Sequence, residues 1–445
     1  MKKLTLSNLL LPLLAATAHA QVYAAGLNRM QDLGGLTSSS MGSDANAVSA
    51  DGSVVVGQVD YGSGGKYHAF RWTSDGGMQD LGDLTANGTG WSVAYSASAD
   101  GSAVVGHASY AAYGLHAFRW TIDGGMQDLG DLTASGTGSS AARAVSADGR
   151  VVAGQADYVL YGKYHAFRWT SEGGMQDLGD LTASGTGTSY TNAISADGSA
   201  VVGGADYGTG ANAHAFRWTS AGGMQDLGDL TASGTGSSNA IAISADGSVV
   251  VGEASYGSGW WSHAYRWTSD GGMQDLGDLT ASGTGWSEAS AVSADGSVVV
   301  GEANYGSSWW SHAYRWTSDG GMQDLGDLTA SGTGWSAARA VSADGSVVVG
   351  RADYGSGASS HAFRWSSESG MQDLGDLTAS GTGWSYAKEV SADGRTVVGL
   401  SSTDYGYVTR AFIYRTSMQD FSNLLSSLPK LAADKELAAA QQQMR

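Results

Sequence analysis

The 445-residue chain contains no cysteine and only two prolines. Without cysteine it can form neither a disulfide nor a thiolate metal site. Lys and Arg together number 23 against 42 Asp and Glu, and this scattered basic minority argues against nucleic-acid binding. After residue 20 no stretch approaches the roughly 18 apolar residues of a membrane-spanning helix. We therefore expect a mature chain without a membrane span.

The first residues have the pattern of a secretory signal peptide. Lys2 and Lys3 precede an apolar run that ends in Ala18-His19-Ala20, a typical cleavage pattern. We expect residues 1–20 to be removed on export. The mature protein is then extracellular or associated with the outer membrane at the cell surface, with the periplasm as the alternative.

The chain is rich in glycine, with 68 residues, and it repeats itself every 48 or 49 residues. Each period carries Ala-Asp-Gly and Met-Gln-Asp, and seven of the eight carry His-Ala-Phe or His-Ala-Tyr, which the last replaces with Arg-Ala-Phe at residue 410. The marker Met-Gln-Asp begins at residues 30, 78, 126, 175, 224, 273, 322, 371 and 418. These positions delimit eight periods.

Each period contains four strand-like segments, here named A to D. In one copy, segment A is 289–293, B is 297–301, C is 312–317 and D is 322–328. Tight turns join A to B and C to D, and longer Gly/Ser/Thr loops join B to C and D to A, which predicts a four-stranded antiparallel meander. Because one such sheet cannot bury both its faces, we expect an all-β, eight-bladed β-propeller of about 49-residue repeats. An open β-solenoid is the alternative.

The two ends of the repeat region bear on how the ring closes. The repeats begin with a D segment, residues 30–36, and end after a C segment, residues 410–415. The first segment could therefore complete the last blade, although residues 418–420 offer a second D segment. We assign residues 21–416 to the propeller and residues 417–445, which lack glycine, to a helical tail.

The recurring string HAFRW…GMQDLGDL…AVSADGSVVVG resembles the bacterial extracellular repeats named after their HAF tripeptide. The resemblance covers residues 27–416. Related repeats occur in exported proteins and in autotransporter passengers, so it implies a secreted or cell-surface protein. The C-terminal barrel of an autotransporter does not follow the repeats in this sequence.

Several polar residues recur in every period, and we interpret them as structural. The histidines of the HAF marker are expected to form hydrogen bonds within their blades, because strand C is too far from the axis for the copies to share a metal ion. The Arg of HAFRW and the Asp of Met-Gln-Asp, such as Arg71 and Asp80, are expected to pair across the C–D hairpin. Turn aspartates such as Asp295 and Asp344 are expected to form turns, although a weak calcium site at one rim is the alternative.

Nothing in the sequence indicates catalysis, because almost every polar residue is repeated and no catalytic motif stands in a suitable context. We expect no enzyme activity, no cofactor and no metal; an enzyme that uses the central channel is the least favoured hypothesis.

The tryptophans give the functional prediction. Seven belong to HAFRW and are expected in the core, whereas eight lie in B–C or D–A loops, which emerge on the same face of a propeller. Variable aromatic loops on a rigid scaffold are typical of binding sites. The predicted ligand-binding residues are Trp260, Trp261, Trp286, Trp309, Trp310 and Trp335.

We therefore predict an adhesin-like interaction module that binds a glycan or a host or cell-surface protein through this face. Two alternatives stay open. The loop tryptophans could pack between the blades, or the protein could be a structural autotransporter-type passenger with no ligand of its own.

Overall fold

A computed structural model of the chain describes residues 29–416, apart from 38–39, 41, 62–65, 111–113, 160–161, 210–211, 258–260, 307–309, 357–358 and 405–407. The predicted signal peptide and helical tail lie outside these residues. Contacts within the chain define one unit from Met30 to Ile413, and the rest of the chain forms a second unit. No helix in the described part is long and apolar enough to cross a membrane.

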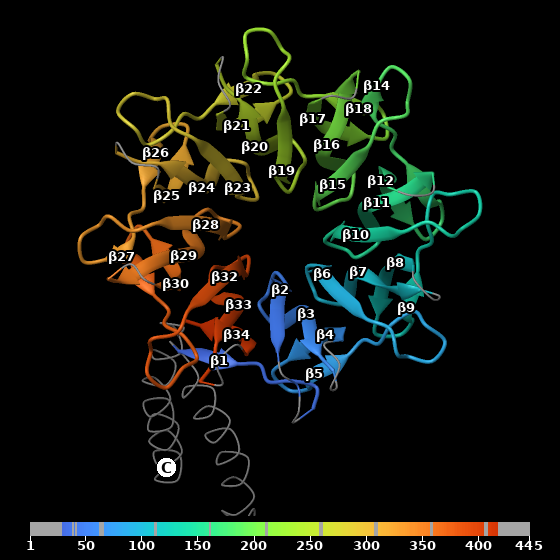
Figure 1. Ribbon diagram of the computed structural model, residues 1–445, viewed down its shortest axis with the longest axis horizontal. Coiled ribbons are helices and arrows are strands. Elements are labelled where there is room, and N and C mark those ends of the chain that lie inside the picture. Colours follow the sequence, from blue (N-terminus) through green and yellow to red (C-terminus); the bar gives the residue numbers. More distant parts are fainter. Residues whose placement is uncertain are drawn as a thin grey trace, which may run out of the picture. The chain divides into compact units, whose positions relative to one another are not determined.

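Eight antiparallel sheets stand around a ring, each with strand A innermost and strand D outermost (Figure 1). The predicted eight-bladed β-propeller is therefore confirmed. We number the blades 1 to 8 in the order of their A strands. The A strands are β2 (Ser43–Val48), β6 (Ser92–Ala97), β10 (Ser140–Val145), β15 (Ser189–Ile194), β19 (Ser238–Ile243), β23 (Ser287–Val292), β28 (Ser336–Val341) and β32 (Ser385–Val390).

The other three strands of each blade follow in the same order. The B strands are β3 (Val54–Asp60), β7 (Ala103–Tyr110), β11 (Val151–Val159), β16 (Ala200–Gly208), β20 (Val249–Ser255), β24 (Val298–Asn304), β29 (Val347–Gly355) and β33 (Thr396–Ser402). The C strands are β4 (Tyr67–Thr73), β8 (Gly114–Thr121), β12 (Lys163–Thr170), β17 (Asn212–Thr219), β21 (Ser262–Thr268), β25 (Ser311–Thr317), β30 (Ser359–Ser366) and β34 (Thr409–Arg415). The D strands are β5 (Gly77–Asp80), β9 (Gly125–Asp128), β13 (Gly174–Asp177), β18 (Gly223–Asp226), β22 (Gly272–Asp275), β26 (Gly321–Asp324), β31 (Gly370–Asp373) and, in blade 8, β1 (Met30–Asp32). Two short strands, β14 (Leu181–Thr182) and β27 (Leu328–Thr329), pair in parallel with β16 and β29.

Blade 8 closes the ring with strands from both ends of the repeat region. β1 pairs with β34 and so supplies the outermost strand, which is the first of the two possibilities that the sequence left open. The second D segment, 418–420, lies outside the described residues. Ser43 Oγ joins blade 1 to blade 8 by accepting from Ala411 N at 3.0 Å and donating to Gly34 O at 3.1 Å.

The Ala-Asp-Gly turns close a second ring. The alanine N–H of each turn donates to the alanine carbonyl of the next blade's turn, at 2.8–3.0 Å. The donors run in order around the ring, and the last donates to the first: Ala50, Ala99, Ala147, Ala196, Ala245, Ala294, Ala343 and Ala392. Because buried or turn amides need partners, this ring requires the same turn geometry in all eight blades.

The hydrophobic core lies between neighbouring blades. One cluster joins Val249, Val251 and Leu276 of blade 5 to Val299 and Trp316 of blade 6. Equivalent clusters recur between other blade pairs, including blades 8 and 1. The HAFRW tryptophans of blades 2 to 7 are only 5–6 % exposed, which confirms the core prediction for these six, whereas Trp72 of blade 1 is half-buried.

Only glycine fits at the end of the Val-Val-Val-Gly run. In blade 6, a Cβ on Gly301 would lie 1.9 Å from the carbonyl oxygen of Glu288 on the neighbouring strand. The register shifts beside this pair, between Ala289 and Ala291. The bulge brings the two backbones too close for any side chain at this position.

Candidate binding face

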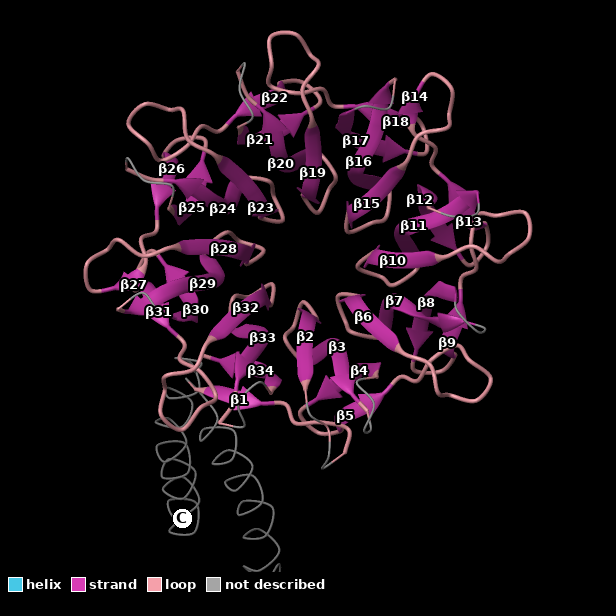
Figure 2. Ribbon diagram, in the orientation of Figure 1, coloured by secondary structure: helices cyan, strands magenta, loops and turns pink. Residues whose placement is uncertain are grey.

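The B–C and D–A loops lie on one face of the ring, which we call the loop face. Direct contacts show this in blades 1 and 5. Lys66, at the end of a B–C loop, donates from Nζ to the Thr89 carbonyl in the following D–A loop at 2.5 Å. Trp286 Nε1 in the next D–A loop donates to Ser262 Oγ of blade 5 at 3.0 Å. The long D–A loops stand out at the rim between blades (Figure 2).

Seven of the eight D–A loops share one internally bonded conformation, and the exception is the loop before blade 1, which has Gly35 at the aspartate position. In the loop between blades 2 and 3, Asp131 Oδ1 accepts from Thr133 N at 2.5 Å, and Asp131 Oδ2 accepts from Gly138 N at 3.0 Å. Gly136 takes a φ of 63°, a conformation that glycine adopts without strain. The aspartate thus holds both ends of the loop, and the residue after Gly138 is presented at a fixed position.

That fixed position is occupied by Trp91, Trp286, Trp335 or Trp384, and elsewhere by Ser or Thr. Trp91 and Trp384 are each 40 % exposed. Trp286 and Trp335 are half-buried, since Trp286 is bound to Ser262 and the guanidinium of Arg351 lies 4.4 Å from the Trp335 ring centre. Two of the predicted ligand-binding tryptophans are therefore partly engaged within the protein.

The other predicted tryptophans lie in B–C loops. Trp261 is 41 % exposed and Trp310 is 54 % exposed, at corresponding positions of blades 5 and 6. Their carbonyls accept backbone bonds from Tyr256 and Tyr305, which close the two loops. Trp260 and Trp309 lie outside the described residues. Among the predicted site residues that the structure describes, Trp261 and Trp310 thus have the highest exposed fractions.

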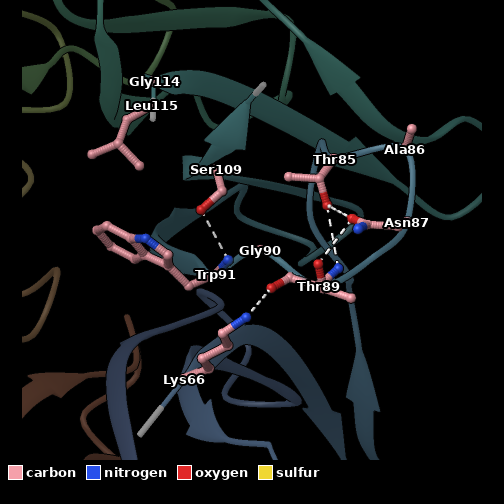
Figure 3. Close-up of a pocket in the computed structure, with 10 residues that line it drawn as sticks. All are labelled: Lys66, Thr85, Ala86, Asn87, Thr89, Gly90, Trp91, Ser109, Gly114 and Leu115. Atoms are coloured by element: carbon pink, nitrogen blue, oxygen red, sulfur yellow. Dashed lines mark hydrogen bonds between the residues drawn. The ribbon is translucent and has the colours of Figure 1, made fainter. Parts of the chain in front are cut away.

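A cavity of about 770 Å³ beside Trp91 was not among the predicted sites (Figure 3). Its lining includes Lys66 of a B–C loop, Asn87 and Trp91 of the following D–A loop, and Ser109 and Leu115 of strands β7 and β8. The Trp91 indole stands at its wall, and Trp91 N is held by Ser109 Oγ at 2.9 Å. The sequence signal was present, since Trp91 stands in the same loop position as Trp286.

The repeated histidines form hydrogen bonds inside their blades, as predicted. His68 is buried, its Nδ1 lies 2.8 Å from Asp80 Oδ1, and Tyr61 stacks on its ring at 3.7 Å. The same triad recurs in blades 2 to 7 around His116, His165, His214, His263, His312 and His361. Each histidine is thus committed to its own blade. The described residues contain no group of three or more His, Cys, Asp or Glu side chains arranged to hold a metal ion.

In blade 3 these contacts also change the pKa of the histidine. Burial alone lowers the pKa of His165, but the hydrogen bond and charge of Asp177 and the charge of Asp180 outweigh it and raise the pKa above its ordinary value. In blade 3 these contacts therefore favour the protonated ring of His165.

The predicted pairing of Arg71 with Asp80 is wrong. The register of the C–D hairpin places Arg71 opposite Gln79 and Phe70 opposite Asp80, so the Arg and Asp side chains lie on opposite faces of the sheet. Arg71 Nε instead donates to the carbonyl of Gly101, in the A–B turn of the next blade, at 3.0 Å. The arginine therefore links blades rather than hairpin strands.

The turn aspartates act as predicted turn formers. Asp295 Oδ1 accepts from Ser297 N at 3.0 Å and from Ser293 Oγ at 2.7 Å. These hydrogen bonds lower the pKa of Asp295 to about 2. The carboxylate oxygen that faces the turn is thus occupied by the chain itself.

The innermost strands carry residues that differ from blade to blade, which the sequence analysis missed. Lys388 of blade 8 donates to Asp44 of blade 1 at 2.7 Å, and Arg339 of blade 7 lies 3.2 Å from Glu302 of blade 6. In blade 6, Glu288 and Glu302 stand directly opposite each other on β23 and β24. Burial and the neighbouring charge of Glu253 raise the pKa of Glu288 to about 7.

Comparisons with known proteins identify the fold and no family. No family model matches the chain. No curated protein matches it either. Among solved structures, a prolyl endopeptidase is 10 % identical with a TM-score of 0.51, over 81 % of this chain and 54 % of that one. TolB from Acinetobacter baumannii is 13 % identical with a TM-score of 0.35, over 72 % of this chain and 79 % of that one. The β-propeller domain of the Trilobed protease from Pyrococcus furiosus is 10 % identical with a TM-score of 0.45, over 84 % and 95 %.

Proposed function

We propose that this propeller is an exported, adhesin-like interaction module that binds a carbohydrate through the tryptophans of its loop face. One observation carries the proposal. Trp261 and Trp310 are 41 % and 54 % exposed, whereas the framework tryptophans of blades 2 to 7 are 5–6 % exposed. These two rings lie at the same loop position of adjacent blades, and exposed aromatic rings in the variable loops of a rigid scaffold are typical of binding sites.

The chemistry around these rings fits a sugar. The D–A loops on the same face carry exposed Ser and Thr hydroxyls, such as those of Ser282 and Thr284. An indole offers a flat apolar surface for the C–H face of a sugar ring, and nearby hydroxyls can bind its OH groups. The cavity beside Trp91 repeats this combination, with Asn87 and Thr89 near the indole.

The place of action follows from the sequence. The pattern of residues 1–20 and the resemblance to HAF repeats both indicate export to the cell surface or the medium. There, a glycan or a host or cell-surface protein is available as a partner. We keep the membership in the HAF-repeat family as part of this proposal, because it rests on the repeat motif alone.

A glycan array tests the proposal with purified residues 21–445. The parent is compared with a Trp261→Ala/Trp310→Ala variant and with Ile122→Ala, which removes a 62 % exposed apolar side chain on a C–D turn. We expect the parent and Ile122→Ala to bind the same glycans and the double variant to lose binding at least tenfold.

Two results would contradict the proposal. If none of the three proteins retains a glycan, the carbohydrate ligand is wrong, and a protein ligand or a purely structural passenger becomes the better account. If the double variant binds as the parent does, the site lies elsewhere.

A further inference from the structure

Three glutamates meet where blades 5 and 6 adjoin near the axis. Glu288 and Glu302 are a cross-strand pair on β23 and β24, and Glu253 lies on β20 of the preceding blade. The charges of Glu253 and Glu302 both act on Glu288. Like charges opposite each other destabilise a sheet. We call Glu253, Glu288 and Glu302 the glutamate cluster. Because like charges lower the stability of the sheet, folding alone does not explain why these glutamates lie together.

The residues around the cluster occupy the same repeat positions as residues that line a cavity between blades 2 and 3. There, a cavity of about 220 Å³ is lined by, among others, His107, Leu115, Ser139, Ala141, Arg143 and Gln155. The matching strand registers pair Ala141 with Gln155 and Glu288 with Glu302. In blades 5 and 6, the residues at the same six repeat positions are Glu253, Ser262, Trp286, Glu288, Ser290 and Glu302. The loop-face residues Trp286 and Ser262 therefore belong to the same location as the glutamates.

Hydrogen bonds connect this location to the loop face. Trp286 Nε1 donates to Ser262 Oγ at 3.0 Å, and Ser262 Oγ donates to Glu253 Oε2 at 2.8 Å. The indole and one carboxylate are thus held in fixed positions by a shared hydroxyl. Glu253 and Glu288 are both partly exposed.

A buried phenol without a partner lies in the same blade, on the opposite face of the sheet from the side chains of Glu288 and Glu302, because Tyr314 pairs with Gly301 and Glu302 pairs with Ala313. Tyr314 is 0 % exposed, and its hydroxyl has no hydrogen-bond partner among the described residues. In blade 5 the matching hydroxyl of Tyr265 donates to the Asn239 carbonyl at 3.2 Å, and Asn239 occupies the position of Glu288. The other blades have phenylalanine here. Ser290 Oγ, on the same strand as Glu288, also lacks a partner in the described part.

In blade 7, arginine side chains occupy the positions that correspond to Glu302 and Ser290 of blade 6. Arg351, at the position of Glu302, lies with its guanidinium 4.4 Å from the Trp335 ring centre and 5.0 Å from that of Tyr386. Arg339, at the position of Ser290, lies 3.2 Å from Glu302. Blade 6 keeps the tryptophan, as Trp286, and has no arginine at either position.

The charges of the cluster are only partly balanced. Glu302 pairs with Arg339, but Glu253 and Glu288 have no ion-pair partner within 4.0 Å among the residues that the structure describes. A guanidinium can bind carboxylates through paired N–H groups while stacking on an indole. We propose that the glutamate cluster, with Trp286, binds the guanidinium of an arginine side chain supplied by a partner protein or peptide.

This inference goes beyond the proposed carbohydrate function and does not depend on it. Its residues are the glutamates and Trp286, whereas the carbohydrate proposal rests on Trp261 and Trp310. The Trp261→Ala/Trp310→Ala variant therefore separates the two. It should lose glycan binding and keep arginine binding.

The test is calorimetric titration with N-acetyl-arginine amide, and the control ligand is N-acetyl-citrulline amide, which has nearly the same shape and no charge. We expect millimolar or tighter binding of the arginine ligand, and binding of the citrulline ligand at least about tenfold weaker. Glu253→Gln/Glu288→Gln should weaken arginine binding at least about tenfold. Glu368→Gln, on an exposed C–D turn, should change nothing.

A pH series sharpens the test. Because the pKa of Glu288 is raised to about 7, arginine binding should be tighter at pH 8 than at pH 6 in the parent. The pH effect should be smaller in Glu288→Gln. Equal binding of the two ligands by the parent, or undiminished binding by the glutamine double variant with an unchanged far-UV circular dichroism spectrum, would overturn the proposal. So would the absence of arginine binding up to about 10 mM.

Discussion

The two faces of this propeller come from the same eight repeats but differ in how far their residues vary. On the face of the A–B turns, Ala-Asp-Gly recurs in every blade, and the eight alanines form a closed ring of backbone hydrogen bonds. On the loop face, the position after the second Gly of Gly-Thr-Gly is Trp in some blades and Ser or Thr in others. A ring bond needs one geometry from every blade, whereas an exposed loop residue need only fit its own surroundings. Residues that may differ between blades are the ones free to bind a ligand.

The buried tryptophans of the HAFRW marker and the exposed tryptophans of the loops should differ most in how much they contribute to stability. Trp316, which is 6 % exposed, packs between blades 5 and 6, and Trp310 of the same blade is 54 % exposed. Trp316→Ala should lower the free energy of unfolding by about 3–5 kcal/mol, because it leaves a cavity in the core. Trp310→Ala should lower it by less than about 1 kcal/mol. Urea unfolding followed by circular dichroism measures both, and similar losses would remove the distinction.

A smaller effect is expected from the serine that joins each blade to the one before it. Ser287 Oγ accepts from Ala264 N at 2.9 Å and donates to Gly277 O at 2.5 Å. Ser287→Ala leaves a buried N–H without a partner, which should cost about 1–3 kcal/mol of unfolding free energy. The matched control is Ser297→Ala, whose hydroxyl lies on an exposed turn. If both variants unfold at the same urea concentration, the serine does not join the blades as described.

The smallest effect concerns pH and the inner strands. The pKa of Glu288 is raised from 4.5 to about 7, mainly by burial, so the folded protein holds a proton that the unfolded chain has already lost. The stability contributed by this proton is present below pH 4.5 and falls as the pH rises to about 7. The melting temperature of the parent should therefore drop more over this range than that of Glu288→Gln. Other groups with shifted pKa values, including Glu389, His165 and His214, are shared by both proteins, so the difference between the two curves reports Glu288. A constant difference across the range would contradict the raised pKa.

The sequence was sufficient to predict the fold because the repeat marks its own turns. Ala-Asp-Gly and Met-Gln-Asp delimit every blade, whereas the sequence left open which of two D segments, residues 30–36 or 418–420, closes the ring. The pairing of Arg71 with Asp80 could not be predicted correctly, because a shift of one residue in register moves a side chain to the other face of the sheet. The repeat fixes the order of the strands but not this register.

The candidate sites were predicted only in part. Loop position was enough to place Trp261 and Trp310 on one face, but exposure depends on neighbouring side chains. Trp335, for example, is covered by Arg351, which lies on strand β29 and not in the loop. The glutamate cluster was missed because Glu288 and Glu302 come together only when β23 and β24 are paired.

The central claim is that the loop tryptophans bind a ligand and do not hold the blades together. The most direct measurement determines urea stability and glycan-array binding of Trp261→Ala/Trp310→Ala on one preparation, next to the parent. The account predicts an unfolding free energy within about 1 kcal/mol of the parent, with glycan binding lost. A variant that loses several kcal/mol of stability, or that keeps full glycan binding, would contradict it.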